Sequence, residues 1–269
     1  MKTRIALALV VVAVTAALLA GMAGGETTRL NVDPAWLADK SWDDGAAVVS
    51  VFRGKLKWYG EWREAEIRHY VVREYMHPKQ LVKQEPPAKD SIPVLKANVL
   101  ISFETGTYPY RQMCSMFFDR RTGALIKAVG SSQEGCGASF QRWDRESQRL
   151  SYDTYWANEG VGSRAIDKRG TRLFVNELPI LAGILRPGRI QLLPSLVLSS
   201  VRNRSVSDAN VTRSGDVVEI GAHRYRFDTE GFLDSWTVPG EEEFRRVAKK
   251  RLYYWQHSGN GDEKLLEAK

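Results

Sequence analysis

Apolar and polar side chains alternate with a period of two along several stretches of the chain. Between Trp62 and Met76, one set of positions holds Ala65, Ile67, Val71 and Tyr75, and the positions between them hold Glu64, Glu66, Arg68 and Glu74. The same alternation occurs over residues 95–103 and 224–228. A period of two gives each face of a β-strand its own set of side chains, whereas an amphipathic helix repeats every 3.6 residues. These stretches therefore predict strands with one buried face.

Turn sequences separate the predicted strands. They are Arg121-Thr122-Gly123, Ser214-Gly215-Asp216, Asp228-Thr229-Glu230-Gly231 and Pro239-Gly240. Such residues favour the tight connections of β-hairpins. Three prolines between residues 85 and 93 predict an exposed, extended connection there, because proline cannot donate to a sheet ladder. Short strands with frequent turns are typical of an antiparallel, mainly β fold.

Two segments fit either a helix or a strand. Residues 173–185 are densely apolar around Pro179, as expected of a short helix that caps an open sheet or of one more buried strand. In residues 241–255, a helical stripe is formed by Phe244, Val247, Ala248, Leu252 and Trp255, with Glu241 to Glu243 at the favourable end of the helix dipole. A long final strand fits the second segment equally well.

The first 23 residues differ from the rest of the chain. Lys2 and Arg4 precede an apolar stretch, Ile5 to Ala20, and the small-x-small sequence Gly21-Met22-Ala23 follows it. This pattern predicts a secretory signal peptide cut after Ala23; the alternative is an uncleaved anchor formed by residues 5–23. In both cases the rest of the protein is exported to the periplasm or another extracytoplasmic space. We predict a flexible lead-in (24–45), a single β-rich domain (46–257) and a flexible tail (258–269).

Composition excludes several classes of protein. The chain has 269 residues, of which 43% are hydrophobic, so it can bury a substantial core and is not intrinsically disordered. Two cysteines are too few for a disulfide-dense scaffold or a four-thiolate zinc site. The formal charge of +7 falls when the first 23 residues are removed, because they carry two cations and no acids. A mildly basic mature chain does not indicate a nucleic-acid partner, and it agrees with contact with anionic lipid or envelope polymer.

No catalytic constellation stands out. The segment Ser131-Ser132-Gln133-Glu134-Gly135-Cys136-Gly137 places a carboxylate, an amide and a thiol among glycines. A nucleophilic cysteine needs a base, yet the four histidines lie at no spacing that predicts pairing. The same spacing gives no metal motif. We therefore predict no catalytic residues, no metal site and no cofactor.

The two cysteines, Cys114 and Cys136, are candidates for a disulfide in an exported protein. A bond between them would close a loop of about 23 residues and stabilise the fold by about 3.4 kcal/mol. If residues 108–118, 124–132 and 136–143 form a simple meander, however, the cysteines lie on strands about 9.6 Å apart, beyond the bridging limit of about 7 Å. The bridge then requires Cys136 to lie in a turn.

The chain resembles a known family over residues 54–255. The matching landmarks are Val82-Lys83-Gln84-Glu85, Pro93-Val94-Leu95-Lys96, Thr105-Gly106-Thr107-Tyr108-Pro109-Tyr110, Ser132-Gln133-Glu134 with Cys136-Gly137, Pro187-Gly188, Pro194-Ser195-Leu196 and Tyr254-Trp255. They resemble a family of uncharacterised exported proteins and lipoproteins, some labelled septum formation inhibitors. The family has tryptophan where Gly135 stands here and lacks the first cysteine. The septum label is not carried over, since the pyrophosphatases of that name need a Ser-Pro-Arg-Arg element that this chain lacks.

More loosely, an exported β-rich domain of this size is similar to the half-barrel folds of periplasmic lipoprotein carriers, in which a curved sheet wraps an apolar cavity. This resemblance is one of fold and transfers no residues. We therefore expect a mainly β protein, built as a curved antiparallel sheet or half-barrel of many short strands with one or two short helices. If a cavity exists, we expect Tyr108, Tyr110, Gln133 and Glu134 at its rim.

Three functions follow as hypotheses. The first is a non-enzymatic envelope protein that binds a lipid or another apolar or amphipathic ligand, or an envelope partner. The second is a hydrolase or transferase acting on envelope polymers, with Glu134 as a general acid or base. The third is a structural or assembly protein that acts through a sheet edge or an arginine-bearing face. Ligand, partner and oligomeric state stay open at this point.

Overall fold

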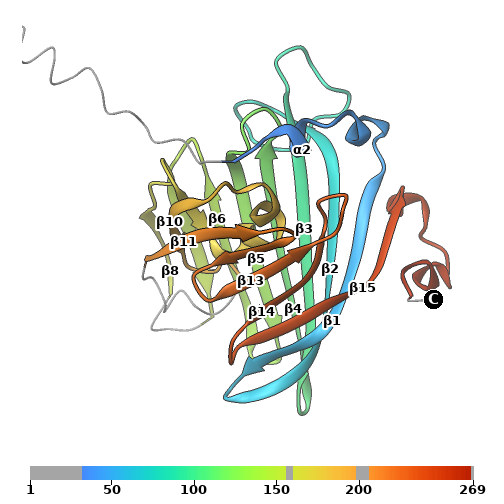
Figure 1. Cartoon of the computed structure of the whole chain (residues 1–269), viewed down its shortest axis with the longest axis vertical. Helices are drawn as coiled ribbons and strands as arrows, with labels where there is room; N and C mark the ends of the chain where they lie inside the picture. Colours follow the sequence, from blue (N-terminus) through green and yellow to red (C-terminus); the bar gives the residue numbers. More distant parts are fainter. Residues whose placement is uncertain (1–31, 156–159, 198–205, 268–269) are drawn as a thin grey trace, which may run out of the picture.

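The computed structural model describes residues 32–155, 160–197 and 206–267. One sheet of 15 strands dominates it, in the order β8-β7-β6-β5-β4-β3-β2-β1-β15-β14-β13-β12-β11-β10-β9 (Figure 1). The strands are β1 (Ala47–Trp58), β2 (Glu61–Met76), β3 (Ile92–Thr105), β4 (Tyr108–Asp119), β5 (Leu125–Glu134), β6 (Gly137–Asp144), β7 (Arg149–Thr154), β8 (Val161–Ala165), β9 (Arg172–Phe174), β10 (Gly188–Leu193), β11 (Ser207–Ser214), β12 (Val217–Ile220), β13 (His223–Phe227), β14 (Leu233–Val238) and β15 (Glu242–Leu252). The predicted fold class is confirmed.

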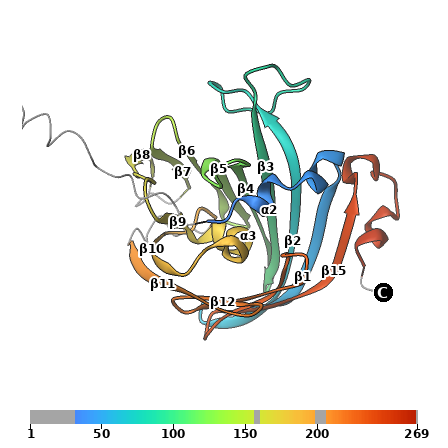
Figure 2. The same cartoon turned by 45° about the horizontal axis from the view of Figure 1, so that its top comes forward.

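The seam of the sheet lies between its first and last strands. β1 pairs with β15 antiparallel, with Val48 opposite Arg251 and Gly54 opposite Phe244. From this seam, β1 to β8 form one antiparallel meander and β15 back to β10 form another, while β9 adds to β10 in parallel. The edge strands β8 and β9 follow each other in the sequence, so the curved sheet brings its two ends to the same side without closing (Figure 2).

A short helical segment fills part of the concave side, and we call residues 175–184 the plug. It consists of η2 (Val175–Glu177), α3 (Leu178–Leu181) and η3 (Ala182–Ile184). Figure 2 shows it inside the curl of the sheet. The capping-helix interpretation of residues 173–185 is therefore correct. For residues 241–255 the strand is correct, because β15 has two neighbours to pair with and a helix would leave the backbone of β1 without a partner.

A buried ion pair fastens the plug. Lys168 Nζ lies 2.7 Å from Glu177 Oε1 and also donates to the carbonyl of Arg172 at 3.1 Å. The Phe174 backbone N–H donates to Glu177 Oε1 at 2.8 Å. Both charged side chains are buried. Every polar atom of this centre thus has a protein partner at close range, as a buried charge requires.

The predicted strands and turns are confirmed by their positions. The alternation over residues 62–76, 95–103 and 224–228 falls within β2, β3 and β13. The four turn sequences connect β4 to β5, β11 to β12, β13 to β14 and β14 to β15. The proline segment connects β2 to β3, although Pro93 itself pairs with Tyr75 near the start of β3.

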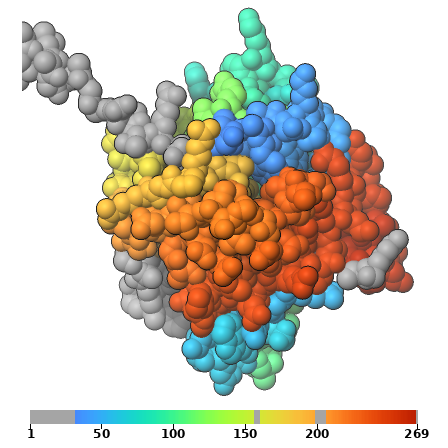
Figure 3. Space-filling model, viewed as in Figure 1, coloured from blue at the N-terminus to red at the C-terminus, as the bar shows by residue number. Residues whose placement is uncertain are grey.

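The predicted flexible lead-in is wrong for the described residues 32–45. They contain α2 (Ala35–Ala38) and η1 (Lys40–Asp44), whose Leu37 and Trp42 are buried. The Arg120 guanidinium donates to the Leu37 carbonyl at 2.8 Å and to Asp43 Oδ1 at 2.7 Å. The segment packs above the outer wall formed by β11 to β15 (Figure 3). The buried side chains of Leu37 and Trp42 hold this segment in place, although its sequence shows no helical or strand periodicity.

The C-terminal tail also differs from the prediction. Residues 262–266 form η5 (Asp262–Leu266), and Leu266 packs against a small cluster of Ala47, Val49 and Val72 on the convex face. This cluster gives the tail an apolar contact on the sheet. The predicted signal peptide or anchor, residues 1–23, lies outside the described residues. Within the described ranges, no helix is long and apolar enough to cross a membrane.

The predicted disulfide is absent: Cys114 and Cys136 are both free. Cys114 is buried in the middle of β4, opposite Gly130 of β5, while Cys136 is exposed in the turn between β5 and β6. Four residues of strand separate Gly130 from the end of β5 at Glu134, which is about 13 Å along the strand direction. This separation is well beyond the reach of a disulfide.

The concave face changes from apolar to polar across the sheet. One row of residues, paired strand to strand, runs from Phe52 on β1 through Ile67, Ile101, Gln112, Ser132 and Ser139 to Thr154 on β7. A second row on the same face, four residues away along β1, is entirely apolar. It consists of Val48, Val71, Ala97, Met116, Ala128, Trp143 and Leu150. The apolar rows form the core, and the mixed row borders the interior space described next.

Candidate functional site

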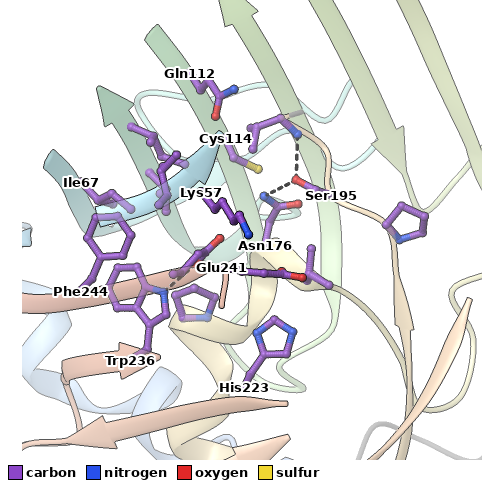
Figure 4. Close-up of a pocket in the computed structure, with 18 of the residues that line it drawn as sticks. Lys57, Ile67, Gln112, Cys114, Asn176, Ser195, His223, Trp236, Glu241 and Phe244 are labelled. Carbon is purple, nitrogen blue, oxygen red and sulfur yellow. Dashed lines mark hydrogen bonds between the residues drawn. The ribbon is translucent and has the colours of Figure 1, made fainter. Parts of the chain in front are cut away.

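A cavity of about 620 Å³ lies between the concave face and the plug. Its walls come from both meanders of the sheet, from the plug, and from the segment that follows β10. The lining residues are Leu56, Lys57, Trp58, Gly60, Ile67, His69, Val99, Ile101, Gln112, Cys114, Val175, Asn176, Pro179, Leu192, Leu193, Pro194, Ser195, Val197, Ser207, His223, Tyr225, Trp236, Glu241, Glu242 and Phe244. Figure 4 shows their arrangement.

One wall of the cavity is aromatic. Trp236 and Phe244 stack with ring centroids 4.7 Å apart, and Phe52 packs edge-on against Trp236 at 5.2 Å. The two rings stack because Trp236 on β14 lies directly opposite Phe244 on the neighbouring strand β15. Alternation along both strands directs these side chains to the concave face together with Tyr225. The result is a set of large apolar surfaces exposed to the cavity.

Hydrogen bonds connect the plug to the segment after β10. Asn176 Nδ2 donates to Ser195 Oγ at 3.3 Å (Figure 4), and the Leu196 backbone N–H donates to Asn176 Oδ1 at 2.7 Å. Leu196 crosses the concave face at Gly130, where any Cβ would collide with the Leu196 carbonyl. Glycine is therefore required at this position of β5 to let the segment after β10 cover the cavity.

Two titratable groups on the cavity wall are held neutral by burial. Burial lowers the pKa of His69 to about 3. Its ring packs against Phe52 with centroids 4.7 Å apart. Burial, with a smaller effect of the Glu177 charge, raises the pKa of the Cys114 thiol. Because the thiolate is the nucleophilic form of cysteine, Cys114 is a small apolar wall residue here.

Titratable groups gather at one end of the cavity, which we call the mouth (Lys57, His223, Glu241 and Glu242). Glu242 Oε2 accepts a hydrogen bond from Trp236 Nε1 at 2.9 Å, and burial raises the pKa of Glu242. Lys57 and Glu241 are joined through their backbones by a hydrogen bond of 2.7 Å. Burial lowers the pKa of His223, which Glu241 partly opposes.

Three of the four predicted site residues, Tyr108, Tyr110 and Glu134, contact one another, whereas Gln133 is exposed on the convex face of β5; none of the four lines the cavity. Tyr110 is buried in a filled aromatic cluster, stacked on Phe103 with centroids 4.7 Å apart. Its hydroxyl lies 2.9 Å from the Tyr59 hydroxyl and 3.4 Å from that of Tyr108. Burial, together with a hydrogen bond to Glu134, raises the pKa of Tyr110.

Gln133 is exposed, and Glu134 is half-buried at the end of β5. The link between this group and the cavity is Trp58, which lines the cavity and packs edge-on against Tyr110 at 5.1 Å. Ligand binding by the four residues stays a prediction. Tyr110 and the residues around it therefore lie close to the cavity, but Trp58 separates them from it.

The residues of the mouth were not predicted as site residues. His223 has the same parity as Tyr225 in β13, and Glu242 has the same parity as Phe244 in β15. The alternation over residues 224–228 was recognised, and extending its parity by one residue would have identified His223 as inward-facing. For β15 the helical alternative concealed the same signal. Within the described part of the chain, no three His, Cys, Asp or Glu side chains lie together in a way that could hold a metal ion.

Fold and site together define a barrel-like β protein whose unclosed sheet encloses a cavity of ligand size. Neither the protein-family models nor the curated proteins gave a match to this chain. Among solved structures, the chain is similar to a β-barrel-like protein of domain of unknown function DUF1849 from Brucella abortus, with a TM-score of 0.43 and 8% sequence identity. The similarity covers 77% of this chain and 98% of that chain.

Proposed function

We propose that this protein is an exported envelope protein that binds an apolar or amphipathic ligand without chemical change. The observation that carries the proposal is the cavity of about 620 Å³ between the sheet and the plug. Small-molecule sites in proteins typically measure about 300–1,000 Å³ and are mostly apolar, with a few polar groups that orient the ligand. Ile67, Val99 and Ile101, together with Trp236 and Phe244, provide such an apolar lining.

A binding role fits the chemistry of the lining better than catalysis. Cys114 is kept as a thiol and His69 as a neutral imidazole by burial, so neither is tuned as a nucleophile or base near neutral pH. Glu134, the candidate acid or base of the hydrolase hypothesis, lies outside the cavity beside the Tyr110 hydroxyl. We therefore favour a carrier or receptor for an amphiphile.

The envelope location rests on the sequence. Lys2, Arg4 and the apolar stretch that follows support export, and the resemblance to exported proteins and lipoproteins over residues 54–255 supports the same compartment. An envelope supplies lipids and other amphiphiles, which match a cavity with an apolar wall and a charged mouth. A partner protein that delivers or receives the ligand belongs to the same proposal.

The test is to fill the cavity and measure binding of an apolar dye. Ile101→Trp adds volume on the concave face, whereas Leu100→Trp, one residue earlier on β3, places the same side chain on the convex face. We expect N-phenyl-1-naphthylamine fluorescence to show at least about tenfold weaker binding for Ile101→Trp than for Leu100→Trp, equal to about 1.4 kcal/mol. Equal binding by the two variants, with both folded by circular dichroism, would contradict the proposal.

A further inference from the structure

The charges that line the cavity are unevenly distributed. Glu241 and Glu242 contribute two carboxylates at the mouth, and Lys57 contributes one ammonium group. Among the described residues, no arginine lines the cavity. His69 and His223 add no positive charge near neutral pH, because burial lowers the pKa of both. When Glu241 and Glu242 are ionised, the lining therefore has an excess of negative charge, which bears on the kind of head group that the proposed amphiphile carries.

Glu242 retains hydrogen-bonding capacity toward the cavity. It is the first residue of β15 and pairs with Leu56 on β1 and Val238 on β14. Among the described residues, its carboxylate accepts one hydrogen bond, from Trp236 Nε1 at 2.9 Å. An ionised carboxylate has about four lone-pair sites, so most of its capacity is open to a ligand. Its position beside the cavity space gives a donor on a ligand direct access to it.

Lys57 does little to neutralise the two acids. Lys57 is the next-to-last residue of β1, and it is exposed. The hydrogen bond of 2.7 Å between Lys57 and Glu241 joins backbone atoms and does not involve the charged groups. An exposed ammonium group is strongly hydrated and screened by salt, whereas a half-buried carboxylate such as Glu242 interacts through a medium of lower dielectric constant. The attraction of the mouth for a cation therefore exceeds its attraction for an anion.

The aromatic wall strengthens the same preference. Trp58, Tyr225, Trp236 and Phe244 all line the cavity, and the faces of aromatic rings carry negative electrostatic potential. A cation within about 6 Å of a ring face is attracted to it, and aromatic walls are typical of sites for ammonium groups. Figure 4 shows Trp236 and Phe244 on the same side of the cavity as Glu241.

We propose that the cavity selects amphiphiles with a cationic head, a primary or quaternary ammonium group, which binds at Glu241 and Glu242 beside the aromatic wall. The alkyl chain lies against Ile67, Val99 and Ile101. This inference rests on the proposed function, because it names the ligand class of the same cavity. A carboxylate or phosphate head would meet two acids and a single exposed lysine, and it binds more weakly.

The test compares three ligands with the same chain: decyltrimethylammonium, decanol and decanoate, each below its micelle concentration, measured by isothermal titration calorimetry at neutral pH. We expect decyltrimethylammonium to bind at least about tenfold more tightly than decanoate, with decanol between them. The preference should fall at least about threefold in Glu242→Gln and in Glu241→Gln. Glu241 is exposed, so its variant keeps the test valid if Glu242→Gln fails to fold.

The matched control is Glu243→Gln. This exposed neighbour pairs with Lys55 at 3.3 Å and does not line the cavity, so its removal should leave the preference unchanged. Equal binding of all three ligands, or tightest binding of decanoate, overturns the cationic-head inference and leaves the cavity function standing. A loss of preference in Glu243→Gln as large as in Glu242→Gln also overturns it. Failure of all three ligands to bind overturns both proposals.

Discussion

Two glutamates in the interior, one buried and one half-buried, have different sets of partners. Glu177, in the plug, contacts Lys168 Nζ at 2.7 Å and accepts from the Phe174 backbone at 2.8 Å. Glu242, at the cavity mouth, accepts one hydrogen bond from the described part of the chain, donated by Trp236. Burial raises the pKa of both carboxyl groups. The difference lies in their partners: the first centre is complete within the chain, and the second has capacity that a ligand can use.

The charge of Glu177 therefore has a structural role, and the charge of Glu242 is available for binding. A buried charge whose partners all come from the protein fastens elements together, and its removal destabilises the fold. A partly buried charge that faces a cavity is available for recognition, and its removal changes binding more than folding. The predictions below test the two sides of this contrast, in order of expected effect.

The largest effect is expected at the plug. Lys168→Met leaves Glu177 buried without its cation and should lower the free energy of unfolding by about 3–5 kcal/mol in urea denaturation. The double variant Lys168→Met/Glu177→Gln should recover part of this loss, because the amide oxygen still accepts from Phe174. Arg169→Met, which removes the exposed ion pair with Asp167, should leave the free energy of unfolding almost unchanged. Similar losses in Lys168→Met and Arg169→Met would contradict the structural role.

A smaller effect is expected from His69, which lines the cavity. Burial lowers its folded-state pKa to about 3, so below the unfolded pKa of about 6.5 the unfolded chain binds a proton that the folded protein does not. Stability is therefore full above about pH 6.5 and falls as the pH drops toward 3. At about pH 5 the loss due to His69 should be about 2 kcal/mol.

The measurement for His69 is urea denaturation of the wild type and His69→Phe at about pH 8 and pH 5. The variant should lose about 2 kcal/mol less than the wild type over this range. His223, whose pKa is also lowered by burial, titrates in both proteins and cancels in the difference. The same pH dependence in both proteins would show that His69 is protonated at no cost to the fold.

The smallest effect on folding is expected at the mouth. Burial raises the folded-state pKa of Glu242, so ionisation at neutral pH opposes folding, and Glu242→Gln removes that opposition. The free energy of unfolding should stay within about 1 kcal/mol of the wild type, unchanged or higher. A loss as large as that of Lys168→Met would place Glu242 with Glu177 as a structural group and remove the contrast.

Much of the fold was predictable because strand alternation is a local signal. β2 and β3 alternate over many residues, and glycine-containing turns mark the ends of later strands. The segment with Leu37 and Trp42 was missed because it packs through single anchors and the distant donor Arg120, which no local pattern reveals. The two helical alternatives required tertiary pairing to decide, since β15 becomes a strand through its neighbours β1 and β14.

The sequence predicted residues close to the cavity but not the residues that line it. Tyr108 and Tyr110 indicated an aromatic group on the concave side, yet packing fills that group and leaves the hollow beyond Trp58. Whether side chains fill a space depends on the curvature of the sheet and on the plug, which are long-range properties. Parity could identify His223 as inward-facing, but the distance between His223 and Glu242 along the sequence hides their common end of the cavity.

The central claim is that the cavity holds an amphiphile. The most direct test is native mass spectrometry of the protein purified from its own envelope fraction, compared with its mass after denaturation. The account predicts extra mass in the native protein that is released on denaturation and identifies as an amphiphile, and that is reduced in Ile101→Trp but not in Leu100→Trp. A native protein at the mass of its chain alone, in repeated gentle preparations, would contradict it.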